Sequence, residues 1–146
     1  MPTEVELAYA AGILDGEGCI SVRKKENRNG RICYYCGLAI AMVDQEVPRW
    51  LLTTFGGFLY TSSRKTKAWR TVYIWRVENK ALMDFLSSIL PYLILKKKRA
   101  ELAIQLCSMV RKKGQSRKPP MTIEEEAGRR EIATQICAAN QRQYIQ

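Results

Sequence analysis

Two carboxylates set among glycines are the residues of this chain that could do chemistry. Asp15 and Glu17 belong to the tetrapeptide DGEG, which follows a run of small residues where a helix would end. Negative charge at that end of a helix opposes the helix dipole by about 0.3 to 1 kcal/mol unless a cation compensates it. Carboxylate and carbonyl oxygens suit Mg²⁺ or Ca²⁺. The pattern indicates a divalent metal site, although the bare tetrapeptide favours a solvated acidic turn.

Small side chains precede these acids at helical spacing. Ala8, Ala11, Gly12 and Asp15 recur every three or four residues, so another backbone can approach this side of the helix closely. The flanks are charged and the stretch is too short to span a bilayer. We therefore expect a second helix to pack there.

The composition indicates a folded protein that binds a polyanion. A chain of 146 residues suits one domain with a hydrophobic core, and 24 basic against 14 acidic residues give a net charge of +10. The absence of histidine excludes histidine metal sites, triads and general bases. We expect no membrane partner and an intracellular protein, in the cytoplasm, nucleoid or an organelle, that is not secreted. The five cysteines are expected to be free thiols.

Hydrophobic periodicity predicts the elements that position the acids. Their order is helix, hairpin, helix, hairpin, helix, helix, with a further helix appended. The strands are expected over residues 20–25, 31–43, 58–63 and 68–77. Asp44 is the expected N-cap of the second helix. We expect a core domain over 1–111, a basic linker over 112–121 and a C-terminal helix over 122–146.

One face of the predicted sheet is basic. Leu38, Ile40 and Met42 would face the core, and the opposite face would carry nearly all positive charge, with Glu26 as its one acid. Charged outer faces are ordinary on antiparallel sheets, but they normally mix signs. The cations of this face are Arg23, Lys25, Arg31, Arg64, Lys67, Arg70 and Arg76. A nucleic acid is therefore the expected partner.

The residues from Ala10 to Gly18 resemble the signature of the LAGLIDADG homing endonucleases, with Ala10 in place of Leu and Glu17 in place of Asp. The predicted element order matches the αββαββα order of that family. The resemblance implies an α+β fold in which a curved four-stranded antiparallel sheet is backed by helices and lies in the DNA major groove. The motif helix would lie at a dimer interface.

A single copy of the motif implies a homodimer, with Ala8, Ala11, Gly12 and Asp15 at the interface. The implied activity is metal-dependent hydrolysis of both strands of a long pseudo-palindromic DNA site, leaving short 3′ overhangs. The implied cofactor is Mg²⁺, held by Glu17 and the Gly16 carbonyl, and Ca²⁺ or Mn²⁺ would substitute in binding.

The resemblance also implies catalytic roles outside the motif. Lys96 would stabilise developing charge or orient water, with Lys98 as the runner-up. Gln45 would order solvent, in a register that the sequence leaves open. The implied DNA-binding residues are Ser21, Arg23, Lys25, Arg31, Cys33, Tyr35, Tyr60, Ser62, Arg64, Lys67, Arg70, Val72, Ile74, Arg76 and Lys98.

Two other functions fit the same fold. An intron RNA splicing maturase or a non-cleaving DNA-binding protein would keep the basic face and lose the chemistry. The acid at Glu17 together with Gly16 and Lys96 favours the enzyme. A purely structural protein would leave the one-sided positive charge unexplained.

Overall fold

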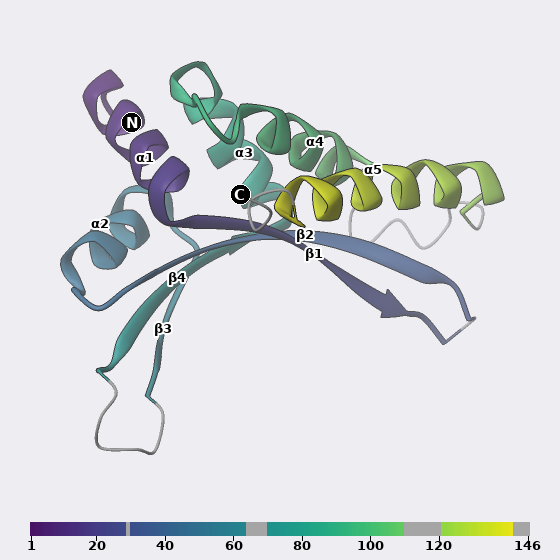
Figure 1. Ribbon diagram of the computed structural model, residues 1–146, viewed down its shortest axis with the longest axis horizontal. Helices are drawn as coiled ribbons and strands as arrows, with labels where there is room; N and C mark the ends of the chain where they lie inside the picture. Colours follow the sequence, from purple (N-terminus) through teal and green to yellow (C-terminus); the bar gives the residue numbers. More distant parts are fainter. Residues whose placement is uncertain (29, 64–69, 110–120, 142–146) are drawn as a thin grey trace.

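One curved antiparallel sheet organises the fold. The computed structural model describes residues 1–28, 30–63, 70–109 and 121–141. Helices cover one face of the sheet, and its concave face is open, with the two hairpins diverging from the centre (Figure 1). The elements are α1 (Glu4–Glu17), β1 (Gly18–Glu26), β2 (Ile32–Met42), α2 (Glu46–Phe55), β3 (Phe58–Ser62), β4 (Val72–Glu78), α3 (Asn79–Ile89), the 3₁₀ helix η1 (Leu90–Tyr92), α4 (Lys97–Ser108) and α5 (Ile123–Gln141). The predicted α+β class and αββαββα order are confirmed.

The strand order is β1-β2-β4-β3, so the two hairpins meet through their inner strands. In β2 and β4 the buried hydrophobic side chains recur at every second residue, as the period of two requires, whereas no residue of β3 is buried. Leu38 and Ile40 of β2 and Trp75 and Val77 of β4 are fully buried. The core side of both hairpins therefore lies where the alternation predicts it, and the intervening residues face away from the helices.

Helix ends follow local signals with one exception. Thr3 and Glu6 form a capping box that starts α1, and Pro91 lies in η1, directly after the end of α3. The predicted N-cap Asp44 is wrong: α2 starts after Gln45, whose side chain makes no capping hydrogen bond. Without such a bond, the packing of α2 on the sheet decides where the helix begins.

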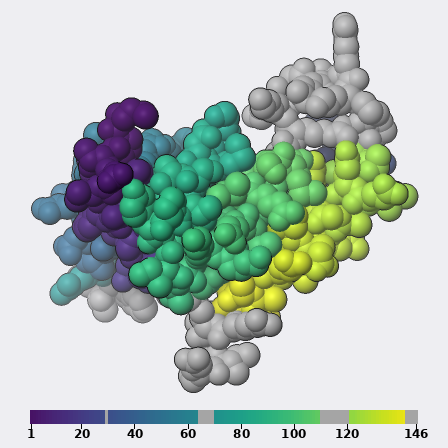
Figure 2. Space-filling view, turned by 90° about the horizontal axis from the view of Figure 1, so that it is seen from above, coloured from purple at the N-terminus to yellow at the C-terminus, as the bar shows by residue number. Residues whose placement is uncertain are grey.

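The last helix shares the hydrophobic core. Ile132 and Ile136 of α5 are buried against the rest of the molecule, and α5 packs on α4 and on the β1–β2 hairpin. The Asn140 side chain donates to the Ile20 carbonyl at 2.8 Å. Figure 2 shows α1 at one end of the helical layer and α5 at the other. Helix α5 therefore braces the first hairpin, while the proposed linker over 112–121 lies almost wholly outside the described residues.

Among the described residues, no helix is both long enough and apolar enough to cross a bilayer.

Candidate active site and nucleic-acid interface

The motif helix passes directly into the first strand. Helix α1 ends at Glu17, and the Gly18 backbone N–H donates to the Leu14 carbonyl. A Cβ at Gly18 would lie 2.1 Å from Leu14 Cδ1 and 2.7 Å from its carbonyl oxygen, so only glycine fits. This close approach puts Glu17 at the junction of α1 and β1. Its side chain is exposed, and among the described residues it accepts no hydrogen bond and forms no ion pair.

Asp15 and Lys96 tie the end of α1 to the start of α4. The Asp15 carboxylate accepts hydrogen bonds from the backbone N–H groups of Ile94 at 2.9 Å, Leu95 at 3.2 Å and Lys96 at 2.9 Å. In return, Lys96 Nζ donates to the carbonyls of Leu14 at 2.8 Å and Asp15 at 2.9 Å. We call this reciprocal arrangement the Asp15–Lys96 clamp. Asp15 thus accepts from N–H groups at and just before the start of α4, and Lys96 donates to carbonyls in the last turn of α1.

Both clamp residues have shifted pKa values. Burial raises the pKa of Asp15, but the three backbone N–H donors together hold it below its ordinary value. Burial lowers the pKa of Lys96, as does the nearby charge of Arg99, while Asp15 and Glu17 oppose the shift. Both charged groups of the clamp are therefore partly desolvated, and each is held by hydrogen bonds to the backbone.

The clamp changes two expectations. Lys96 places a cation at the carboxyl end of α1, so the helix dipole is compensated within the chain and does not by itself require a metal. The Lys96 ammonium also has protein partners, and the residue is only 5% exposed. The predicted direct role of Lys96 on a phosphate is untested, and its observed contacts hold α1 in place.

Oxygen donors for a metal remain at the end of α1. The Glu17 carboxylate has no partner within the described part of the chain, Gly16 is exposed, and a Cβ on Gly16 would meet no atom within 4 Å, so the space is open. One carboxylate and one carbonyl fit a hard divalent cation that keeps waters and binds phosphate oxygens. Within the described residues, no three acidic, cysteine or histidine side chains gather to hold a metal ion. The donors of one chain would therefore need completion by water, by a phosphate or by a second copy.

The other predicted catalytic residues lie apart from Glu17. Gln45 Oε1 accepts a hydrogen bond from Arg49 Nε at 3.0 Å, and no contact in the described part of the chain joins it to the acid. Lys98 is exposed in the first turn of α4. Both roles stay predictions.

The strand pairing brings most of the predicted DNA-binding residues onto the concave face. Arg23 lies opposite Tyr35, Lys25 lies opposite Cys33, and Arg76 pairs with both Ala39 and Phe58. The predicted residues that the register places on this face are Ser21, Arg23, Lys25, Cys33, Tyr35, Tyr60, Ser62, Val72, Ile74 and Arg76.

The remaining predicted contacts are placed differently. Arg70 is exposed just before β4, whereas Arg64 and Lys67 lie outside the described residues. The guanidinium of Arg31 donates to the Met121 carbonyl in the segment that leads into α5, and its contact with DNA stays a prediction. That contact directs Arg31 toward the helical layer instead of the concave face.

One functional candidate was missed. Glu78 ends β4, and the register puts it beside Gly37 on the concave face. Its carboxylate forms ion pairs with Arg23 of β1 and with Arg76 of β4, the latter at 2.6 Å. The signal was present in the sequence, since Glu78 follows Arg76 by two residues and so shares its face. The face is therefore less uniformly positive than predicted.

Comparisons with known proteins agree with this architecture. No protein-family model matches the chain. DNA endonuclease I-CreI of Chlamydomonas reinhardtii is 28% identical over 100 residues, which are 68% of this chain and 61% of that protein's length. The structure of an archaeal intron-encoded homing endonuclease, I-Vdi141I, complexed with DNA, matches with a TM-score of 0.74 and 17% identity over 93% of this chain and 84% of its own. In fold and in motif, the chain is similar to the LAGLIDADG homing endonucleases.

A second solved structure is a DNA complex obtained in the presence of Mg. The homing endonuclease I-CvuI, in complex with the I-CreI target in the presence of Mg and with the DNA not cleaved, matches with a TM-score of 0.72. The identity is 18%, over 93% of this chain and 82% of that one. The LAGLIDADG fold thus extends beyond the motif to nearly the whole chain, including α5.

The exposed side of the LAGLIDADG motif helix differs from the prediction. Ala8 and Gly12 are exposed, and no atom lies within 4 Å of a Cβ built on Gly12. Ala11, in contrast, is 0% exposed, and Asp15 is held in the clamp, so neither is available to a partner as predicted. The reason is that α1 packs against α3 and η1, which cover one side of the small-residue stripe. Val5 and Tyr9, 79% and 53% exposed, extend the open side instead.

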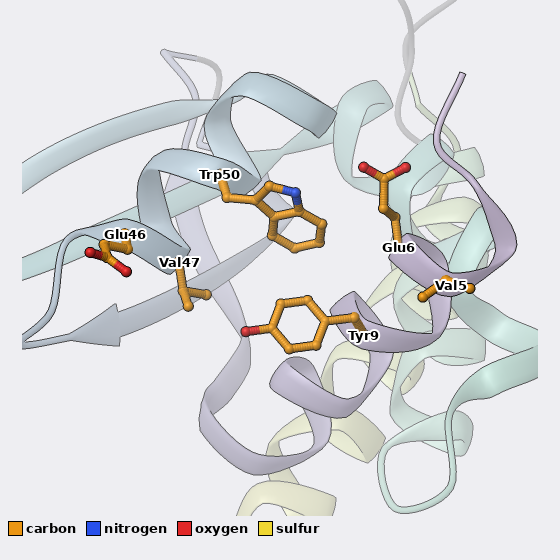
Figure 3. Close-up of a pocket in the computed structure, with 6 residues that line it drawn as sticks. All are labelled: Val5, Glu6, Tyr9, Glu46, Val47 and Trp50. Atoms are coloured by element: carbon orange, nitrogen blue, oxygen red, sulfur yellow. The ribbon is translucent and has the colours of Figure 1, made fainter.

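An open groove of about 350 Å³ separates α1 and α2, lined by Val5, Glu6, Tyr9, Glu46, Val47 and Trp50 (Figure 3). The rings of Tyr9 and Trp50 meet edge to face at 5.1 Å. Eight residues, or about 12 Å of helix, separate Tyr9 from Glu17. The groove is therefore remote from the acid, and it borders the open side of the LAGLIDADG helix.

Proposed function

We propose that this chain is a site-specific double-strand DNA endonuclease that acts as a homodimer. The observation that carries the proposal is the free Glu17 carboxylate at the junction between α1 and β1, where the concave face begins. An exposed acid that has no partner among the described residues, at the start of a strand that carries Arg23 and Lys25, is poorly explained by folding alone. It is well explained by a cation that joins the acid to a phosphate.

The residues of the chain divide the work. Glu17 and the Gly16 carbonyl would hold Mg²⁺, with Ca²⁺ or Mn²⁺ substituting in binding. A divalent ion bound there supplies Lewis acidity to the scissile phosphate and lowers the pKa of bound water. The Asp15–Lys96 clamp fixes the end of α1, so Glu17 keeps one position. Arginines of the concave face would orient the duplex. Lys98 would stabilise charge that develops on the scissile phosphate, and Gln45 would order solvent.

The proposal of a homodimer follows from the number of Glu17 carboxylates that cleavage of two DNA strands requires. Cutting two strands needs two Glu17 sites, and each chain supplies one. The open side of α1, with Ala8 and Gly12, lets a second α1 approach closely about a two-fold axis. Such symmetry implies a pseudo-palindromic target, and we propose staggered cuts that leave short 3′ overhangs. Action on genomic DNA would place the protein inside the cell.

The test is cleavage of a library of long duplexes by the full chain with Mg²⁺. Cleavage of both strands by wild type and its loss in Glu17→Gln, with DNA binding in Ca²⁺ retained, is the expected result. Glu101→Gln, which removes an exposed acid of α4, is the matched control and should cleave normally. Full cleavage by Glu17→Gln contradicts the proposal.

The non-cleaving alternatives give different outcomes in the same assay. A DNA-binding regulator would bind one duplex and cut none. A maturase would bind intron RNA, which the comparison structures do not support, since those reported above contain DNA.

A further inference from the structure

An acid lies among the arginines of the concave face. Glu78 Oε1 accepts from Arg76 Nε at 2.6 Å and also pairs with the Arg23 guanidinium. The Arg76 and Glu78 side chains are 24% and 29% exposed, whereas Arg23 is 56% exposed. The three side chains come from β1 and β4, the neighbours of β2 on its two sides. We call them the Arg23–Glu78–Arg76 triad.

Small residues of β2 make room for the triad. Gly37 pairs with Ser21 on one side and with Glu78 on the other, and Ala39 pairs with Arg76. A Cβ on Gly37 would lie 3.3 Å from a terminal nitrogen of Arg76 and 3.7 Å from Glu78 Oε1. Because Gly37 and Ala39 are small, side chains of β1 and β4 can reach each other across β2.

The local structure leaves Glu78 free for this role. It is the N-cap residue of α3, where a carboxylate would normally accept from helix N–H groups, yet its side chain makes no capping bond. The next residue, Asn79, has φ of 57°, in the left-handed region. The chain therefore turns sharply at the end of β4, and the Glu78 carboxylate stays on the sheet face with the arginines.

We infer that Glu78 is a positioning residue that sets DNA sequence preference by orienting Arg23 and Arg76 toward base edges; this inference rests on the proposed function. Arginine reads guanine through two hydrogen bonds from one planar fork, which requires a fixed guanidinium. Glu78 binds Arg76 through Nε, so among the described residues the two terminal nitrogens of Arg76 keep their donors free for DNA, one of them lying over Gly37. The Glu78 carboxylate also neutralises one of the two positive charges of Arg23 and Arg76, which weakens the sequence-independent attraction to phosphate.

The test compares sequence preference in variants of the full chain. Duplexes with randomised sequence are selected for binding in Ca²⁺, and the affinities for the selected and the random duplexes are then measured across salt concentrations. In Glu78→Gln we expect the ratio of these affinities to fall about tenfold or more. Affinity for random DNA should rise, because an added net charge strengthens phosphate binding.

Two further variants separate orientation from charge and folding. Asp84→Asn changes net charge equally but affects only an exposed pair with Lys80 on α3, so its preference should equal wild type. Gly37→Ala keeps every charge and crowds Arg76, so it should lose preference without gaining affinity for random DNA. Thermal unfolding of each variant serves as the folding control.

The outcomes are decisive. Unchanged preference in both Glu78→Gln and Gly37→Ala overturns the inference, and so does an equal loss of preference in Asp84→Asn. A wild type that selects no sequence contradicts the proposed function instead, which keeps the two failures distinct.

Discussion

Asp15 and Glu17 are two residues apart, and their surroundings give them different tasks. Asp15 accepts three backbone N–H groups and is part of the fold, whereas Glu17 is exposed and free among the described residues. A carboxylate that binds backbone donors is stabilised in its charged form, and one left in solvent is available to a cation. The division of labour between the two acids is therefore set by the neighbouring start of α4.

The lowered pKa of Asp15 predicts a specific loss of stability in acid. Stabilisation by this carboxylate is fully present above the unfolded pKa of 3.8 and is lost as pH falls through the lower folded value. Asp15→Asn should lower the free energy of unfolding by about 1 to 2 kcal/mol at pH 7. Below pH 4 the difference from wild type should shrink. Urea unfolding between pH 2 and 7 measures this, and a constant difference would contradict it.

Lys96 and Lys98 should respond differently to the same substitution. Lys96→Met leaves the carbonyls of Leu14 and Asp15 without their ammonium donor, so the free energy of unfolding should fall by about 1 to 3 kcal/mol. Lys98 is exposed, so Lys98→Met should change stability by at most about 0.5 kcal/mol. Denaturant titration compares them. Equal stability of the two variants would show that the clamp contributes little.

At the scale of elements, the glycines of the motif have opposite requirements. Gly18 tolerates no side chain because Leu14 fills the space, whereas Gly12 has open space around it. Both follow from the course of α1, which packs inward along Ala10, Ala11 and Leu14 and leaves its other side uncovered. Identical residue types in one motif thus serve folding at one position and access at another.

Substitutions at these glycines should separate folding from assembly. Gly12→Ala should stabilise the monomer by about 0.5 to 1 kcal/mol through helix propensity, and it should weaken self-association by adding bulk to the open side of α1. Gly18→Ala should unfold much of the protein or sharply lower its midpoint temperature. Thermal unfolding and sedimentation velocity measure both effects. Normal self-association of Gly12→Ala and also of a bulkier Gly12→Leu would place the dimer contact elsewhere.

Hydrophobic periodicity predicted where these helices and strands lie, but it did not predict which other elements pack against them. Alternation assigned the core side of β2 through Leu38 and Ile40, because a strand with one buried face has one register. The stripe on α1 was wide enough to include both Ala11, which is buried, and Ala8, which is exposed. Which edge of a stripe is covered depends on α3 and η1, far along the chain.

The site was predictable to the same degree. The motif predicts Glu17 and Gly16 as metal donors, and alternation placed Arg23, Lys25 and Arg76 on the concave face. The contacts of Lys96 and Arg31, and that of Glu78 with Arg23, were not predictable, because the partners are 82, 90 and 55 residues away in the sequence. Local patterns carry no information on such pairs.

At the scale of the whole molecule, the distribution of positive charge favours binding of a polyanion. The net charge is +10, and the concave face carries Arg23, Lys25 and Arg76 while the helices fill the opposite side. Only one acid, Glu78, interrupts the cations that the register places on the described part of this face. The attraction to DNA should therefore be strong, delocalised and sensitive to ions in solution.

Affinity for DNA should depend steeply on salt. Each phosphate neutralised should contribute roughly 0.9 to the negative slope of log K against log salt. Lys25→Ala should reduce the slope by up to about 0.9 per subunit and weaken binding to all sequences alike. Fluorescence anisotropy from low to moderate salt measures the slope. A flat response in wild type would rule out the concave face as the phosphate contact.

The strand order also bears on how the protein behaves before it meets DNA. With β2 and β4 in the centre, β1 and β3 are the two edges, and each presents unpaired backbone groups along one side. Such edges invite sheet extension between molecules, which charge and short length discourage. Edge strand β1 carries Arg23, Lys24 and Lys25 in succession, and β3 has five residues. The cations proposed to bind DNA would therefore also protect the free protein against aggregation, and substituting them to alter DNA affinity would lower its solubility.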